Sequence, residues 1–538
     1  MASGSPAQHE YDSSGADRLL FALLGAAAFA GCVLFFGYEY GRDQGIYATV
    51  AGAIARGGAP YLDAWDFKPP GIFVVYAAAR GAFGPGMQSV RLLELAVYAS
   101  LLPAFMLLSR RWLGDAKPGV LAAFVAFYAQ FQLEYWDTAQ PESFAGVAVV
   151  WALVFAVRAE DAVRAGDRLR ASFATGLLYA IAGLFKPHLG AGLAVSAWMV
   201  CCAAGRRGAS PWAAFLACSA GAALGLSICA AWLMAAGAGP ATLETFAVFL
   251  PAYHALHFEW ARLPVFAART LRDVALGYTA LLPGGLLALA ALPPLGARER
   301  RALLHLGGVL ALQLLGVAYQ GRFYPYHFAA SLTLLALPAG WGLWKGWLRA
   351  RVAWPGAVAA GVALALLAWP APQIPSYGAV EFWQRVGLRG RLLFGAVDPR
   401  AVNLLHTAGD VHYGANRRVA DWLATSTAPD APIYVWGFEP MLYEMSGRRP
   451  ASRWIHNVPQ RLEWTQRARA RSELMQDLER QPPAAVILVK NDVRAGVTGS
   501  RRDSLTELQG FGELQAWLAD GYRRAYRIED FEVYLPRD

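Results

Sequence analysis

The chain has 538 residues, of which 56% are hydrophobic and only 16% are charged, whereas about a quarter of the residues in an ordinary soluble domain are charged. The formal net charge is +9, but most of the excess arginine lies in short loops between apolar segments. The positive-inside rule explains such arginines without a nucleic acid. These values exclude a wholly soluble protein and give no support to a nucleic-acid partner.

The long apolar segments lie between residues 18 and 371, and the remaining C-terminal part has the composition of a water-soluble domain. Residues 1–18 are polar and end in Arg18, before an apolar run that has no small-residue cleavage site. This pattern predicts a cytoplasmic N-terminal tail followed by a membrane anchor. All five cysteines lie inside apolar segments, so no disulfide framework is expected in the exported parts.

About 20 apolar residues are needed for a helix to cross the hydrocarbon layer. On this basis we expect an α-helical polytopic membrane protein with about eleven transmembrane helices. The expected spans lie near residues 19–38, 89–109, 118–134, 142–158, 171–186, 189–204, 212–235, 277–295, 303–319, 328–347 and 353–371.

Positive charge alternates between the loops that join these spans. Five loops carry clusters of Arg and Lys, at residues 110–117, 158–170, 206–207, 298–301 and 345–351. By the positive-inside rule, these loops lie on the cytoplasmic side of a bacterial inner membrane. The long loops 39–88 and 236–276 and the short loops 135–141 and 320–327 then lie on the periplasmic side. With an odd number of spans, the C-terminal domain is also periplasmic.

Two parts of this periplasmic side have a recognisable pattern. Within the loop 39–88, the stretches 44–55 and 70–83 are amphipathic and too short or too polar to span, which is typical of helices in the plane of the membrane interface. In the C-terminal part, expected strands at 433–436, 485–489 and 531–535 alternate with expected helices at 415–424, 441–446 and 472–480. This order predicts a small α/β domain over residues 372–538.

Ionisable residues from distant parts of the chain gather on this predicted outer face. Ionisable groups are costly at membrane depth and are therefore candidates for a functional site. Lys186 and Arg322 are the strongest candidates, because both directly adjoin apolar spans. The others are Asp43, Asp63, Asp66, Lys68, Glu134, Asp137, Glu142, His188, His254, His257, Glu259 and His327.

Four short motifs resemble those of a known superfamily. The first outer loop contains Gly-Arg-Asp-Gln-Gly-Ile-Tyr at 41–47 and Asp-Phe-Lys-Pro-Pro-Gly at 66–71, and Arg91 begins the second span. Gly-Leu-Phe-Lys-Pro follows at 183–187, and Gly-Arg-Phe-Tyr-Pro-Tyr at 321–326. Together they resemble the GT-C superfamily of membrane glycosyltransferases, in its protein O-mannosyltransferase and lipid A aminoarabinose transferase branch. The resemblance covers residues 19–371. One departure is Gln44, where the family often has a second acid.

The resemblance implies a glycosyltransferase, that is, a hexosyl- or pentosyltransferase using a polyprenyl-phosphate sugar. Its module would be residues 19–371, and its partners would be that donor, membrane lipids, and a glycan, lipid or protein acceptor. The outer-loop residues Gln44, Tyr47, Tyr61, Asp63, Asp66 and Tyr324 would contact the substrate or shape the site.

The chemistry of such a donor requires few protein groups. A polyprenyl phosphate is already a good leaving group, so it needs cations rather than a general acid, and one carboxylate suffices to take the proton of the attacking hydroxyl. The sequence offers Asp43 as this base and Lys68, Lys186 and Arg322 as the cations. Direct attack by the acceptor predicts inversion at the sugar carbon.

No cofactor is certain from the sequence. His254 and His257, together with Asp66 or Asp43, could bind a divalent metal. The alternative, which we favour, is that the two histidines form hydrogen bonds with the loop backbone. A secondary transporter of a polar or anionic solute is the main alternative function. Transporters usually carry their charges near the midplane of the membrane and show inverted repeats, which we do not find here.

Overall fold

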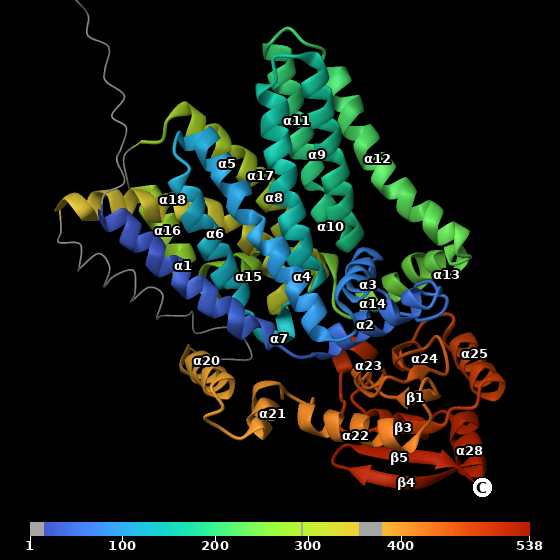
Figure 1. Ribbon diagram of the computed structural model, residues 1–538. Helices are drawn as coiled ribbons and strands as arrows, with labels where there is room; N and C mark the ends of the chain where they lie inside the picture. The colour runs from blue at the N-terminus through green and yellow to red at the C-terminus, as the bar shows by residue number, and fades with distance from the viewer. Residues whose placement is uncertain (1–14, 292–293, 354–378, 538) are drawn as a thin grey trace, which may run out of the picture.

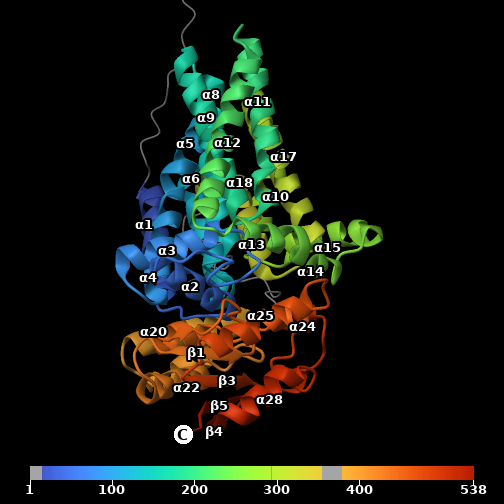
Figure 2. The same cartoon turned by 90° about the vertical axis from the view of Figure 1, so that its right-hand side faces the viewer.

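The computed structural model describes residues 15–291, 294–353 and 379–537. These residues form a helical bundle with a smaller C-terminal region at one end, and short helices of the first outer loop lie between them (Figures 1 and 2). The bundle consists of α1 (Gly15–Phe36), α4 (Met87–Ala99), α5 (Leu101–Leu113), α6 (Lys117–Gln132), α8 (Pro141–Asp161), α9 (Ala165–Phe185), α10 (Pro187–Gly190), α11 (Gly192–Arg206), α12 (Pro211–Ala235), α15 (Leu263–Leu276), α16 (Leu281–Ala291), α17 (Ala297–Gln320) and α18 (Ala329–Ala353).

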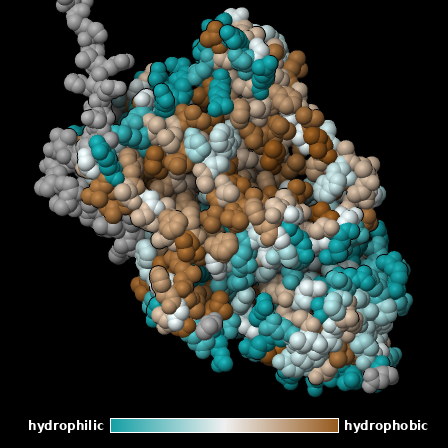
Figure 3. Space-filling model, viewed as in Figure 1, coloured by the Kyte–Doolittle hydropathy of each residue, from teal (hydrophilic) through white to brown (hydrophobic). Residues whose placement is uncertain are grey.

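The surface of this bundle is suited to lipid. Hydrophobic residues dominate its face in Figure 3, whereas hydrophilic residues gather over the C-terminal region and at the opposite end of the bundle. On α12, the large apolar side chains of Trp212, Ile228 and Met234 are all at least 60% exposed. A continuous apolar surface of this kind marks a membrane-facing region, so the membrane protein expected from the composition is confirmed.

The number of spans is confirmed only in part. Six described helices are long and apolar enough to cross a membrane, and the pair Trp260–Leu276 and Leu281–Ala291 is a seventh if it counts as one span bent by 93°. Helices also occupy the expected spans 118–134, 171–186 and 328–347, as α6, α9 and α18, without meeting that criterion. The eleventh expected span, 353–371, lies outside the described residues except for Ala353.

Close helix crossings hold the bundle together. A Cβ atom at Gly176 of α9 would come within 1.8 Å of the Cys218 carbonyl of α12, and one at Gly221 within 2.0 Å of the Phe173 carbonyl. Only glycine permits this approach. Small residues at such contacts are typical of helices that pack in lipid, because close backbones gain van der Waals contact there.

The five Arg- and Lys-rich loops lie at one end of the bundle, as the sequence predicted. Asp161 at the end of α8 forms ion pairs with Arg111 of α5 and Arg207 beyond α11. Lys345 of α18 pairs with Glu299 of α17 at 2.9 Å. Arg111, Glu160 and Arg301 line one cavity. These contacts connect all five loops, at the end opposite the C-terminal region (Figure 1).

The other end of the bundle carries short helices from the loops. They are α2 (Arg42–Ala55), α3 (Gly71–Phe83), α7 (Glu134–Asp137), α13 (Gly239–Glu244), η1 (Thr245–Phe249), α14 (Leu250–Ala255), η2 (Trp260–Arg262) and η3 (Pro325–Phe328). Helices were expected at 44–55 and 70–83, but α2 differs from an interfacial helix, because nearly all of its residues are buried. The C-terminal helix α23 (Met441–Ser446) packs on it. A contact so distant in sequence cannot be read from local periodicity.

The C-terminal region has the expected α/β character. Its sheet has the strand order β2-β1-β3-β5-β4, with β1, β2 and β3 parallel and β5 antiparallel to both β3 and β4. The strands are β1 (Pro432–Trp436), β2 (Arg449–Pro450), β3 (Ala485–Val489), β4 (Tyr522–Ile528) and β5 (Phe531–Pro536). The three expected strands are β1, β3 and β5, while β2 and β4 were not predicted. Burial explains the difference, since β1 and β3 are almost wholly buried and apolar, whereas β4 is mostly exposed.

The C-terminal region also contains helices. The expected helices correspond to α22 (Tyr413–Ser426), α23 and α25 (Arg467–Arg480). The remaining ones are α20 (Ala379–Leu393), η4 (Pro399–Ala401), α21 (Val402–Leu405), α24 (Val458–Arg461), α26 (Ala495–Thr498), α27 (Ser504–Leu508) and α28 (Gly512–Gly521). Helix α20 lies apart from the sheet, beneath α1 and α7 (Figure 1), where Arg389 pairs with Glu134 at 2.5 Å.

Candidate active site

Asp43 lies in the first turn of α2, at the end of the bundle that carries the C-terminal region. An acid is favoured there by the helix dipole. Its side chain is 23% exposed, and its Oδ2 lies 4.0 Å from Nζ of Lys68. The neighbouring Arg42 is buried and pairs with Glu439 at 2.5 Å and with Asp410 at 3.1 Å. The start of α2 is therefore anchored from the C-terminal region, with Asp43 left accessible.

Gln44 and Tyr47 attach the second outer loop to α2. The Gln44 amide donates hydrogen bonds to the carbonyls of Tyr135, Trp136 and Thr138, at 2.7–3.1 Å. Tyr47 donates to the side-chain oxygen of Gln140 at 2.9 Å. Gln44 thus uses its NH₂ group to fix this loop. Asp43 is the one acid of the stretch 41–47.

Lys68 is held by the turn that precedes α3. Tyr61, which has a positive φ of 68°, donates its hydroxyl hydrogen bond to the Lys68 carbonyl at 2.8 Å. Asp66 accepts a hydrogen bond from the Lys68 N–H at 3.0 Å. Asp63 is exposed and closes the turn by accepting from the Ala59 N–H at 2.7 Å. Asp63 therefore shapes the turn and stays outside the charged cluster.

Electrostatics keep Lys68 charged and Asp66 ionised. Burial lowers the pKa of the Lys68 ammonium, but the carboxylates of Asp43 and Asp66 outweigh burial and raise it above the usual value. Burial likewise raises the pKa of Asp66, but the Lys68 ammonium and the hydrogen bond with His456 more than offset this, so the net pKa lies below its usual value. The ammonium also lies 5.5 Å from the Tyr47 ring and 4.9 Å from the Phe67 ring, which stabilises a cation.

Lys186 is the most fully paired of the three cations. It caps the end of α9, its Nζ lies 2.7 Å from a carboxylate oxygen of Glu142, and it donates to the Gln320 side chain at 2.8 Å. The Glu142 side chain is fully buried. Glu142 therefore neutralises Lys186 at close range, while Asp43 and Lys68 are only loosely paired.

Arg322 has the opposite environment. It follows Gly321, which ends α17 with a positive φ of 66°, and no described carboxylate forms an ion pair with it. Its guanidinium stacks 3.7 Å above the ring of Tyr253 and donates to the hydroxyl and the carbonyl of the same residue. A planar guanidinium with no bound carboxylate is well suited to a phosphate.

Two aromatic rings connect Arg322 with Lys68. The ring of Tyr253 packs against that of Phe67, with centroids 4.3 Å apart, and Lys68 lies against the Phe67 ring. Burial raises the pKa of Tyr253 to about 12, with the charges of Arg322 and Lys68 acting in the opposite direction. Lys68 and Arg322 thus belong to one cluster and do not point to opposite sides of the bundle.

Tyr324 and Asp137 complete this end of the bundle. Tyr324 is 38% exposed and stacks on Tyr326, with centroids 5.7 Å apart. Asp137 is buried, and burial together with the nearby Asp43 carboxylate raises its pKa well above the usual value. A raised pKa favours the protonated form of a carboxyl group, which can donate a hydrogen bond.

The possible metal ligands do not come together. His254 contacts the Tyr319 carbonyl at 2.8 Å, and His257 contacts the Gly496 carbonyl. Both histidines therefore bond to backbone, as the favoured alternative predicted, but to that of α17 and α26 and not to that of their own loop. Asp66 pairs with His456 at 3.3 Å. Across residues 15–291, 294–353 and 379–537, no three His, Cys, Asp or Glu side chains form a group that could hold a metal ion. The sequence-based metal set of Asp66, His254 and His257 is therefore not assembled.

The C-terminal region contributes residues that sequence reasoning missed. His456 is completely buried beside Asp66, and its ring packs on Trp65. Glu439 binds Arg42, and Arg453 donates to the Tyr61 carbonyl at 3.1 Å. These partners lie more than 350 positions from the outer loop, so no local pattern could reveal them. The sequence marks Glu142 only as one of several acids on the predicted outer face.

The fold and this site define a polytopic membrane protein whose acid and cations meet at one end of the bundle. The chain matches the crystal structure of ArnT from Cupriavidus metallidurans bound to undecaprenyl phosphate, with a TM-score of 0.57, 15% identity, and coverage of 96% of this chain and 97% of that one. The apo structure of the same protein gives a TM-score of 0.56 at 16% identity, covering 96% and 98%. ArnT is a GT-C glycosyltransferase. No protein-family model and no curated sequence matches the chain.

The chain shares its fold with the two ArnT structures. The structural match extends over nearly the whole length of both chains, so it includes the C-terminal region as well as the helical bundle. The resemblance drawn from the motifs at 41–47, 66–71, 183–187 and 321–326 is confirmed at the level of the fold.

Proposed function

We propose that the chain is a glycosyltransferase that moves a sugar from a polyprenyl-phosphate donor to an acceptor hydroxyl. One observation carries this proposal: the partly exposed Asp43 carboxylate lies beside Lys68, in the same cluster as Arg322, which no described carboxylate neutralises. This arrangement supplies a base and unsatisfied positive charge together. The shared fold with ArnT, which has been crystallised with undecaprenyl phosphate, supports a donor of this class.

The reaction follows from these positions. The acceptor oxygen attacks the anomeric carbon as Asp43 takes its proton, and the bond from that carbon to the phosphate oxygen breaks. The electron pair leaves with the polyprenyl phosphate, which Lys68 and Arg322 stabilise. A single displacement of this kind inverts the anomeric carbon. The transferred sugar is a hexose or a pentose.

The three cations have unequal roles in this proposal. Because Glu142 already neutralises Lys186 at 2.7 Å, Lys186 contributes less to the phosphate than Lys68 and Arg322. Asp66 and Tyr61 orient Lys68, and Gln44 and Tyr47 position the second loop. Tyr324 presents a partly exposed ring, which suits contact with a sugar or with the acceptor.

The cellular setting is part of the same proposal. We assign residues 1–18 to the cytoplasm of a bacterial cell, residues 19–371 to the transmembrane module in the inner membrane, and residues 372–538 to a periplasmic domain. The Arg-rich loops at the far end of the bundle then face the cytoplasm, in agreement with the positive-inside rule. The acceptor is a glycan, a lipid or a protein of the cell envelope.

The alternative of a secondary transporter fits the charges less well. Transporters bind their substrates near the midplane, between broken helices. Here Lys68 and Arg322 lie in loops and Asp43 lies in the first turn of the short helix α2, all at the end of the bundle beside the C-terminal region. A cluster in that position serves chemistry at one membrane surface.

The proposal is tested with Asp43→Asn. In cells that lack the native chain, wild-type protein should restore one sugar on an envelope glycan, lipid or protein, as measured by mass spectrometry. The polyprenyl-phosphate sugar that accumulates in cells without the protein should then be consumed. Asp43→Asn should lower the rate about 10²–10⁴-fold, the usual value of a general base, with unchanged expression and melting temperature. Asp167→Asn, which changes an exposed aspartate in the first turn of α9 at the other end, is the matched control. Retention of more than about a tenth of the rate would remove Asp43 from this role.

A further inference from the structure

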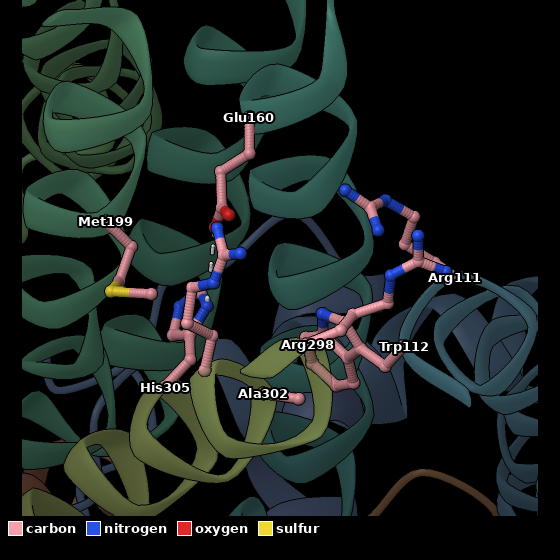
Figure 4. A pocket seen from close by; sticks show the side chains of 8 residues that line it. Arg111, Trp112, Glu160, Met199, Arg298, Ala302 and His305 are labelled. Carbon is pink, nitrogen blue, oxygen red and sulfur yellow. Dashed lines mark ion pairs between the residues drawn. The ribbon is translucent and has the colours of Figure 1, made fainter. Parts of the chain in front are cut away.

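A second group of charged side chains lies at the opposite end of the bundle, around a cavity of about 160 Å³. Arg111 and Trp112 of α5, Glu160 of α8, and Arg298 and His305 of α17 are among its lining residues. Figure 4 shows Glu160 pointing from α8 toward the side chains of α17, with Arg111 and Trp112 on the side formed by α5. The catalytic proposal uses none of these residues.

Positive charge is in excess around this cavity. Arg111 is bound by Asp161 through two hydrogen bonds. Arg298 and Arg301 also line the cavity, and in the part of the chain that the structure describes neither forms an ion pair with a carboxylate. Glu160 is the one acid among the lining residues. Two guanidinium groups therefore remain available for an anion.

The inner wall of the cavity is polar and fixed. His305 lies 3.6 Å from the carboxylate of Glu160, its other ring nitrogen lies 2.8 Å from the Ser196 hydroxyl, and Ser196 lies 2.8 Å from the Tyr179 hydroxyl. Despite this network, Oε1 of Glu160 is buried and receives no hydrogen bond from any described residue. A buried carboxylate oxygen usually has a donor, so a ligand that carries a donor would satisfy it.

The position and the residue types favour a phosphate group. Arg298 and Arg301 stand in the first turns of α17, where the backbone dipole also favours an anion. Guanidinium groups bind phosphate through paired, charge-assisted hydrogen bonds. On α11, Trp198 precedes the lining residue Met199 and is 70% exposed. Exposed tryptophan on a membrane helix is typical of the headgroup level.

We propose that this cavity binds a phosphate that also carries a hydrogen-bond donor. The phosphate oxygens bind Arg298 and Arg301, and the donor satisfies Glu160. Two sources share this chemistry: the headgroup of a phospholipid with a free hydroxyl, such as phosphatidylglycerol, in the leaflet at this end of the bundle, and free hydrogenphosphate. The site lies at the other end of the protein from Asp43 and does not rest on the proposed transferase activity.

Binding to the purified full-length chain in detergent tests this site. The probes are dihexanoylphosphatidylglycerol and inorganic phosphate, with affinity measured by titration and by the shift in melting temperature. The double variant Arg298→Gln/Arg301→Gln should bind at least about tenfold more weakly than wild type, since loss of one hydrogen bond to a charged group already weakens binding by about this factor. The control Arg164→Gln/Arg170→Gln removes the same charge from exposed positions at the same end. It should change the affinity less than about twofold, which is well below the effect of losing one hydrogen bond to a charged group.

The outcomes separate the two sources and the alternatives. If wild type binds the lipid and only the Arg298→Gln/Arg301→Gln variant loses this binding, the ligand is a phospholipid headgroup. If wild type binds inorganic phosphate but not the lipid, and only this variant loses phosphate binding, the ligand is free phosphate. Equal weakening in both double variants, or no measurable binding of either probe, overturns the proposal, because diffuse surface charge then accounts for the arginines. If the double variant fails to fold, Arg298→Gln alone provides the test, since its exposed side chain can be replaced without disturbing the core. Unchanged binding in that variant also overturns the site.

Discussion

At the residue scale, the three predicted phosphate-binding cations differ in how far the protein already satisfies them. Lys186 is paired with a fully buried carboxylate, Lys68 with one at 4.0 Å, and Arg322 with the ring and oxygens of Tyr253. A cation that lacks a carboxylate partner has the most charge to offer a leaving phosphate. Arg322 should therefore matter most and Lys186 least for the departure of the donor.

Substitutions at Arg322 test this order. Arg322→Ala should lower the transfer rate about 10²–10³-fold, the usual cost of one preorganised charge-stabilising group. Arg322→Lys keeps the charge but loses the planar fork, so it should retain part of the activity. The measurements are transfer rate and affinity for undecaprenyl phosphate in the purified protein, with Arg170→Ala, an exposed arginine at the far end, as the control. Equal behaviour of the alanine and lysine variants would show that Arg322 serves the structure and not the phosphate.

At the element scale, the short helix α2 is decisive because it contacts both halves of the molecule. Its first turn holds Arg42 and Asp43, its middle packs against α23, and Arg80 of α3 pairs with Glu444 of α23 at 2.6 Å. Gly45 allows this contact: a Cβ there would lie 2.7 Å from backbone atoms of Met441. A side chain at position 45 must therefore separate α2 from α23.

Gly45→Ala should reduce both stability and activity. Overpacking against backbone costs about 1–3 kcal/mol, and displacement of α23 would also disturb the anchor between Arg42 and Glu439, one residue from Asp43. We expect a lower melting temperature and a reduced transfer rate. Gly25→Ala in α1, where nothing lies within 4 Å of the added atom, should leave both values unchanged. If Gly45→Ala behaves like this control, the contact with α23 does not position the site.

At the scale of the whole molecule, the two ends of the bundle have different chemistry. One end carries five Arg- and Lys-rich loops and the proposed phosphate cavity, and the other carries the acid–cation cluster and the C-terminal region (Figures 1 and 2). This separation is what a protein oriented in a charged membrane requires. The proposed orientation places the C-terminal region in the periplasm.

Single cysteines test this orientation. Ser472→Cys lies on the exposed face of α25 in the C-terminal region, and Val163→Cys lies in the loop after α8, where the side chain is 86% exposed. An impermeant maleimide should label Ser472→Cys in intact spheroplasts and Val163→Cys only after lysis. The wild-type chain, with five native cysteines, gives the background. The reverse pattern would invert the topology and place the acid–cation cluster in the cytoplasm.

Elements with a strong local signal could be predicted from the amino-acid sequence. Apolar length revealed the membrane bundle, charge alternation grouped the five loops at one end, and buried strands such as β1 and β3 were predicted within a residue of their bounds. The motifs around Asp43, Lys68, Lys186 and Arg322 also indicated the GT-C fold. Each of these signals depends only on residues that are close together along the chain, so it can be read from the sequence without knowledge of the fold.

The partners of these residues, by contrast, depend on tertiary contacts. The tertiary structure placed Glu142 on Lys186, Tyr253 under Arg322 and His456 beside Asp66, and it used Gln44 to fix a loop. It also buried α2 against α23, although local amphipathicity predicted that this segment is an interfacial helix. The physical reason is that the charge and orientation of an ionisable group depend on which distant groups share its low-dielectric surroundings. Those neighbours are fixed by packing between elements far apart in sequence.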